Sequence, residues 1–292
     1  MFWLDWRELE KHNDWGVRDK DDATAALWND GAEQWERRSA GELEFAQRQV
    51  DALERITAET GVLDVCCGTG PLTLPLARRA KHVTAFDFNE KMLDLVRKKA
   101  AEAGADNIGY LQGNFNTIVP GEDFEPAEIA VTRHSPAQGN ILKFSRFATK
   151  YCYSLCLVYA PKDAVPMPGR NGSGRWLRSG DESRNHTARP DGRKYGPNIA
   201  FNLLYEAGAN PELRYVTEEK LLTASTHEEL AQKLFPAGSS PELLDYVRRR
   251  AISGPEGLIL RRSQTMAVMG WDPGEIDWEL LEKLGVDWCK AG

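Results

Sequence analysis

Residues 62–70 read VLDVCCGTG, an apolar run that carries one acid and turns through two glycines. The part at 62–66 predicts a buried strand, and Pro71 directly afterwards suits the first turn of a helix, where a missing N–H costs nothing. A glycine turn between a strand and a helix lets a ligand approach bare backbone at the carboxyl edge of a sheet. The stretch therefore predicts an α/β domain with a ligand site at that edge.

Short apolar runs alternate with helical stretches beyond residue 61, which is typical of a parallel sheet covered on both faces. We expect strands at 62–66, 82–86, 108–112, 129–132 and 153–159, and helices at 71–80, 90–103 and 140–150. Further along we expect a helix near 199–207, a strand near 213–216, helices near 228–234 and 241–250, and a last strand at 258–269.

Polar residues end the second and third predicted strands. Asp87 lies 17 residues beyond Gly70, and its carboxylate can accept two hydrogen bonds from a ribose diol. Asn114 and Phe115 follow the third strand and suit the edge and the face of an adenine ring.

The glycine turn, the acid at the end of the second strand and the polar-aromatic pair after the third strand occur in the order typical of one family. In this order they resemble the class I S-adenosylmethionine-dependent methyltransferase family over about residues 61–159. Asp64, Gly68 and Gly70 match its first motif, and Asp87 matches its ribose-binding acid. The resemblance implies S-adenosyl-L-methionine as the cofactor. The contacts it implies are Asp64, Cys66, Gly68, Gly70, Asp87, Phe88, Asn114, Phe115 and Thr132.

Two residues depart from the pattern of that family. Cys66 replaces the first glycine of the motif, a small-for-small change that narrows the turn. Asn114 replaces a carboxylate, but its carbonyl oxygen can still accept the adenine N–H with less charge-assisted strength.

The resemblance also implies a doubly wound, Rossmann-like sheet of seven mostly parallel strands, with the last one antiparallel. We expect a helical lid over residues 1–60, with helices at 23–35 and 41–60, and a cofactor-binding domain over 61–271. A Gly-, Pro- and Arg-rich stretch at about 161–197 predicts an inserted loop, and 272–292 an acidic tail.

Other ligands and activities stay open. A nicotinamide dinucleotide site wants G-x-G-x-x-G/A, whereas this chain has Pro71 and Thr73 within that pattern. A non-catalytic protein that binds S-adenosylmethionine is a second alternative, and a methyltransferase for RNA or protein is a third.

The segment after the fourth strand is where the resembled family lines the acceptor space. His134 is the candidate base or acceptor-orienting residue, although a capping histidine would fit the same place. Arg133 could clamp a carboxylate or could form a surface ion pair. Methyl transfer is an in-line displacement, so positioning matters more than a charged base.

Aromatic and polar residues elsewhere are candidates for substrate binding. Trp28 and Trp35 share one helix face and suit a lid, although core packing would explain them equally. Residues 162–194 carry eight Lys or Arg against four acids, which suits either an anionic substrate or a solvated loop. The remaining candidates lie in or after this stretch: Trp176, Tyr195 and Asn198.

Composition restricts the partners and the compartment. The formal charge of −7 gives no overall attraction to the phosphate backbones of nucleic acids, and we expect a small-molecule acceptor. The five cysteines fit neither a disulfide framework nor a zinc site, so we predict no metal. Without a signal peptide pattern or a long apolar run, we expect a cytoplasmic protein with no membrane contact. The sequence predicts no oligomeric state.

Overall fold

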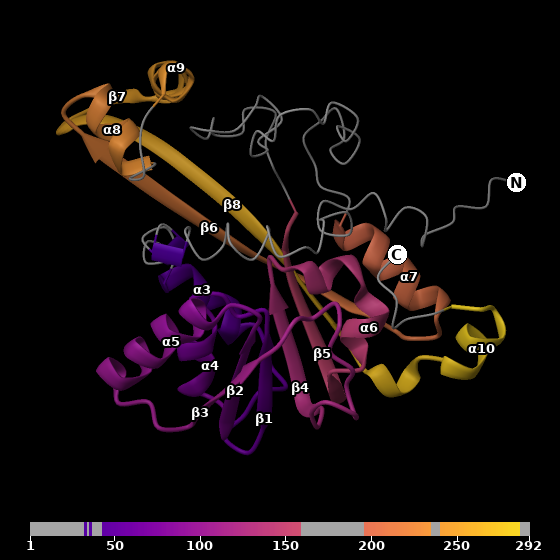
Figure 1. The fold of residues 1–292 in the computed structure, drawn as a ribbon. Coiled ribbons are helices and arrows are strands. Elements are labelled where there is room, and N and C mark those ends of the chain that lie inside the picture. Colours follow the sequence, from indigo (N-terminus) through magenta and orange to yellow (C-terminus); the bar gives the residue numbers. More distant parts are fainter. Residues whose placement is uncertain (1–31, 34, 37–42, 159–195, 235–239, 287–292) are drawn as a thin grey trace, which may run out of the picture. The chain divides into compact units, whose positions relative to one another are not determined.

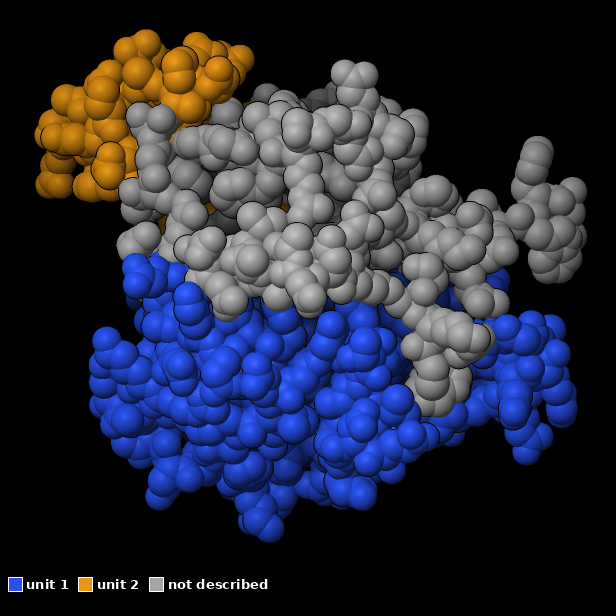
Figure 2. Space-filling view, in the orientation of Figure 1, with its two compact units in different colours: residues 1–156, 195–216, 266–292 blue, residues 157–194, 217–265 orange. Residues whose placement is uncertain are grey.

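A computed structural model of the chain describes residues 32–33, 35–36, 43–158, 196–234 and 240–286. Two compact units are distinguished in Figure 2. Unit 1 comprises residues 1–156, 195–216 and 266–292, and unit 2 comprises 157–194 and 217–265. The predicted domain boundaries at residues 60 and 271 stay predictions.

The sheet has the order β3-β2-β1-β4-β5-β8-β6, and a short strand, β7, pairs with β8. Strands β1 to β5 are all parallel, with β1 between β2 and β4. The strands are β1 (Gly61–Val65), β2 (His82–Asp87), β3 (Ile108–Gln112), β4 (Ala127–Arg133), β5 (Ala148–Leu157), β6 (Glu212–Ala224), β7 (Ile252–Gly254) and β8 (Gly257–Trp271) (Figure 1).

Strand β8 runs antiparallel to β5. A Cβ placed on Gly270 would lie 2.7 Å from the ring of Tyr151, whereas just past the end of β5 the Val158 N–H donates to the Thr265 carbonyl at 3.1 Å. Residue numbers along β8 therefore decrease as those along β5 increase, which is the antiparallel arrangement. The predicted mostly parallel sheet with a reversed last strand is confirmed, and β7 adds a three-residue strand that the sequence did not predict.

Helices cover both faces of this sheet. On β2, Ala85 packs with Leu93 and Val96 of α5, while the next residue, Phe86, packs on the opposite face in the main core. The helices are α3 (Leu43–Asp51), α4 (Thr73–Ala77), α5 (Glu90–Ala103), α6 (Ile141–Ser145), α7 (Gly196–Glu206), α8 (His227–Leu234), α9 (Pro241–Arg250) and α10 (Trp278–Lys283).

Several predicted boundaries were wrong. The helix expected over 41–60 ends at Asp51, and the one expected over 71–80 covers only α4. Residues 148–150, expected to be helical, begin β5, because Ala148 already pairs with Ala127 of β4. The strand expected at 213–216 continues to Ala224, through charged residues that resemble a helix surface in sequence.

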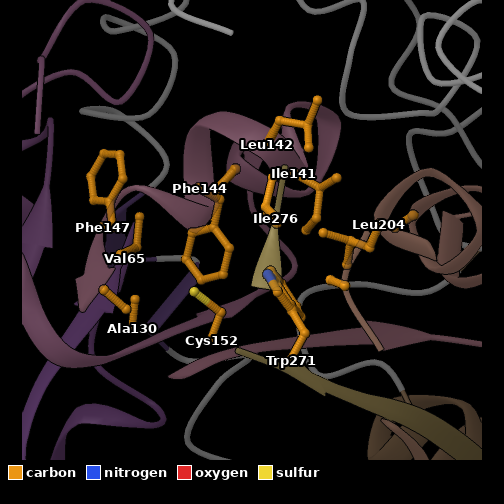
Figure 3. Close-up of a cluster of buried hydrophobic side chains, with 14 of the residues drawn as sticks. Val65, Ala130, Ile141, Leu142, Phe144, Phe147, Cys152, Leu204, Trp271 and Ile276 are labelled. Atoms are coloured by element: carbon orange, nitrogen blue, oxygen red, sulfur yellow. The ribbon is translucent and has the colours of Figure 1, made fainter. Parts of the chain in front are cut away.

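The main core lies where β1, β4, β5 and β8 meet α6 and α7 (Figure 3). Trp271 is fully buried there, and its indole N–H donates to the Ser145 hydroxyl at 2.9 Å. Its ring meets that of Phe144 edge-on, with centroids 5.8 Å apart. No helix within the described ranges is long and apolar enough to cross a bilayer.

Candidate cofactor and acceptor site

The glycine turn follows β1 and is fixed to the end of β2. Gly68 and Gly70 both have positive φ, at +56° and +77°, which glycine adopts without strain. A Cβ on Gly70 would lie 2.9 Å from the Val96 side chain, so this position also requires glycine for space. The Gly68 N–H donates to Asp87 Oδ2 at 2.8 Å, which links the turn to the second strand.

Two buried acids, Asp64 and Asp87, lie next to the glycine turn. Thr73 donates its hydroxyl to Asp64 at 2.6 Å, and the Asn89 N–H donates to the second oxygen of Asp87 at 3.0 Å. Burial raises the pKa of Asp64 to about 7 and that of Asp87 to about 6. Both carboxyls therefore titrate near neutral pH.

The charge of Arg133 opposes part of this shift. Burial is the largest influence on the pKa of Asp64 and raises it, whereas the guanidinium of Arg133 lowers it. Arg133 is half-buried at the end of β4. The structure therefore places the predicted clamp residue within the electrostatic reach of the first-motif acid.

Cys66 and His134 both have left-handed backbone. Their φ angles are +57° and +50°, and they directly follow β1 and β4, which are neighbours in the sheet. Non-glycine residues adopt this region at a cost, and such strain clusters at functional sites. The His134 N–H donates to the Leu155 carbonyl at 3.3 Å, so the turn after β4 is held by β5.

Cys66→Gly is expected to raise the free energy of unfolding by roughly 1 kcal/mol, because glycine removes the left-handed strain and the lost thiol is small. Thermal unfolding measures this change. Cys152→Ala, which truncates a fully buried thiol on an ordinary strand, serves as the control and should lower the melting temperature. A less stable Cys66→Gly variant would show that packing of the thiol outweighs the strain.

The thiols in the turn are held in their protonated form. Burial raises the pKa of both Cys66 and Cys67, and the negative charge of Asp87 acts in the same direction. Neither thiol is a nucleophile at neutral pH. Cys67 is 6% exposed and packs with Ala85, Leu93 and Val96, so its side chain is part of the core.

Side-chain hydrogen bonds join the end of β4 to β1 and the segment after β4 to β5. Thr132 is fully buried and donates its hydroxyl to the Val65 carbonyl at 3.0 Å. The Gln138 amide donates to Ser154 at 3.0 Å and to the Leu155 carbonyl at 2.9 Å. Thr132 therefore fixes the end of β4 to β1, and Gln138, which sequence reasoning did not single out, fixes the turn after β4 to β5.

The predicted adenine residues differ in their environment. Asn114 is half-buried, and its side-chain oxygen accepts the Asn116 N–H at 2.9 Å, which leaves one lone pair for another donor. Phe115 is 3% exposed and packs on Phe147 with centroids 5.3 Å apart, so its ring belongs to the core. Phe88, half-buried beside Asp87, is the aromatic side chain nearer to the surface.

The predicted substrate residues fall into three groups. Trp35 lies at the glycine turn, since a Cβ on Gly68 would stand 3.5 Å from its indole nitrogen. Asn198 is exposed on α7, where its carbonyl accepts from the Asn202 side chain at 2.7 Å. Trp28, Trp176 and Tyr195 lie outside the described residues.

A family model described as a methyltransferase domain matches residues 62–137, from β1 to the turn after β4. Over these residues the chain is similar to methyltransferases, in agreement with the predicted resemblance to the class I S-adenosylmethionine-dependent family. S-adenosylmethionine is the cofactor of this family, and the match covers the glycine turn, Asp87, Asn114 and His134.

Curated relatives share this part of the chain. A demethylmenaquinone methyltransferase from Listeria monocytogenes is 38% identical over 71 residues, which are 23% of this chain and 30% of the relative. A tRNA (uracil-5-)-methyltransferase homolog B from Mus musculus is 34% identical over 77 residues, 26% of this chain and 16% of the relative. The chain thus spans less than a third of the length of either relative.

Solved structures resemble the chain over more of its length, at lower sequence identity. The YcgJ protein from Bacillus subtilis superposes with a TM-score of 0.45 and 15% sequence identity, and the match covers 78% of this chain and 98% of that protein.

Proposed function

We propose that this chain transfers the methyl group of S-adenosylmethionine to a small-molecule acceptor. The observation that carries the proposal is the buried Asp87 carboxylate, which accepts one backbone N–H on each oxygen at the end of β2. Each oxygen keeps a lone pair, so the two can accept the two hydroxyls of a ribose diol. Gly68 and Gly70 beside it leave the backbone open to close approach.

The proposed site residues are Asp64, Gly68, Gly70, Asp87, Phe88 and Asn114 for the cofactor, and Arg133 and His134 for the acceptor. When bound, S-adenosylmethionine supplies an electrophilic methyl group on a sulfonium. The chain holds the ribose through Asp87 and orients the acceptor at the end of β4. His134 accepts the proton of an alcohol or phenol acceptor, whereas an amine or thiol needs less assistance.

The small-molecule acceptor is supported by the acidic net charge of −7 and by the Listeria relative, which is a demethylmenaquinone methyltransferase. An RNA acceptor is the second candidate, because the mouse relative is a tRNA methyltransferase homolog. An anionic polymer would have to overcome the repulsion of an acidic protein, which disfavours RNA.

A two-stage experiment tests the proposal. Calorimetry with S-adenosylhomocysteine should show binding at one site, and NADH under the same conditions should show none. Transfer of a labelled methyl group from S-adenosylmethionine to a fraction of small metabolites, compared with total tRNA, then identifies the acceptor class. Binding of NADH in place of S-adenosylhomocysteine would refute the proposal, and label in tRNA alone would refute the small-molecule acceptor.

Affinity for S-adenosylhomocysteine is expected to fall as the pH is lowered. The pKa of Asp87 is raised by burial to about 6, and protonation removes an acceptor for the diol. The dissociation constant should therefore rise below about pH 6, towards tenfold per pH unit, and stay level above about pH 7. Calorimetry over this range measures it.

Two variants show which carboxyl causes the loss of affinity at low pH. Asp87→Asn should bind weakly at every pH, without the acidic rise. Asp64→Asn removes the second buried carboxyl, whose pKa is about 7, and should leave the rise near pH 6 in place. A level wild-type profile down to pH 5 would contradict the role given to Asp87.

A further inference from the structure

Lys99, on α5, connects the glycine turn to a segment more than sixty residues earlier in the chain. Its ammonium donates to Glu36 Oε2 at 2.7 Å and also to the Thr69 carbonyl within the turn. The side chains of Lys99 and Glu36 are 21% and 25% exposed, so water screens this pair less than a surface ion pair. One ammonium thus holds two elements at once.

Trp35 precedes Glu36 and lies against the turn. A Cβ built on Gly68 would stand 3.5 Å from the indole nitrogen of Trp35, which is an ordinary van der Waals distance. The indole therefore lies against the side of Gly68 where other residues carry a side chain. Gly68 is also the residue whose N–H binds Asp87. The indole therefore lies beside the part of the turn that the proposed cofactor approaches.

We propose that Lys99 is a positioning residue of the cofactor site, which keeps Trp35 on the glycine turn by binding Glu36 and Thr69 together. The effect on a ligand rests on the proposed function, whereas the hold on Trp35 does not. Lysine suits this role because an ammonium has three donors, enough for a carboxylate and a carbonyl. An arginine could also serve both partners, and a methionine of similar length could serve neither.

The first measurement needs no ligand. Hydrogen exchange of the full chain should be at least about threefold faster in peptides covering residues 32–36 and 66–70 in Lys99→Met and in Glu36→Gln, as local opening becomes easier. Lys99→Arg should exchange like the wild type. The matched control is Lys98→Met, which removes a neighbouring lysine that is 72% exposed and pairs with Glu102 at 4.0 Å. Unchanged exchange in both Lys99→Met and Glu36→Gln would overturn the proposal.

The second measurement is the dissociation rate of S-adenosylhomocysteine. We expect it to rise about fivefold in Lys99→Met and Glu36→Gln, the effect of losing one half-buried ion pair, and to be restored in Lys99→Arg. Faster exchange with an unchanged dissociation rate would overturn the link between Trp35 and the ligand. A wild-type chain that does not bind S-adenosylhomocysteine would refute the proposed function, and the exchange measurement would still decide whether Lys99 holds Trp35.

Discussion

Asp87→Ala is expected to weaken the binding of S-adenosylhomocysteine by about 100- to 10 000-fold. The substitution removes an ionised acceptor from two ribose hydroxyls, and hydrogen bonds to a charged group contribute about 1.5–3 kcal/mol each. It also leaves the Gly68 and Asn89 N–H groups without the carboxylate that both bind. Isothermal calorimetry at pH 7.5 measures the loss.

Two controls separate binding from folding in that experiment. Asp94→Ala removes a carboxylate that is 64% exposed on α5 and should leave affinity unchanged. The melting temperature of Asp87→Ala shows whether the variant remains folded. A folded Asp87→Ala protein with the affinity of the wild type would contradict the placement of the ribose at Asp87. The proposed function would then lose its main support.

Trp271→Ala is expected to lower the free energy of unfolding by about 3–5 kcal/mol, the usual cost of emptying a large buried aromatic site. Trp271 is fully buried, contacts Phe144 and donates to Ser145, so the substitution removes packing and a hydrogen bond together. Denaturant unfolding of the full chain measures the change.

A more conservative substitution at the same site separates the contribution of the hydrogen bond from that of the packing. Trp271→Phe keeps a ring and loses the N–H, so we expect a loss of about 1–2 kcal/mol. Leu280→Ala, at a side chain that is 43% exposed, is the control and should change stability by less than about 0.5 kcal/mol. A Trp271→Ala variant as stable as that control would contradict the core described for unit 1.

Local sequence signals were sufficient for the first half of the sheet. Helix α5 begins and ends where predicted, because Asn89 caps its first turn and Gly104, at φ +65°, ends it. Strand β3 likewise matches its predicted bounds. The start of β5 was missed because Ala148 and its neighbours become a strand by pairing with β4, a contact that no local pattern encodes.

The same division applies to the candidate site. Asp64, Gly68 and Asp87 could be found from sequence, since each lies at a fixed distance from the end of a strand. Lys99 could not, because its partners Glu36 and Thr69 lie 63 and 30 residues away and nothing in its own helix distinguishes it from Lys98. The core position of Phe115 likewise depends on Phe147, which reaches it from the segment before β5.

The two adjacent thiols of the glycine turn affect how compounds could be directed at this protein. Maleimides, chloroacetamides and similar electrophiles react with thiolates, and the raised pKa of Cys66 and Cys67 leaves few thiolates at neutral pH. Covalent labelling is therefore a poor route to the turn. An inhibitor aimed there would have to bind reversibly, through the shape of the backbone and the carboxylate of Asp87.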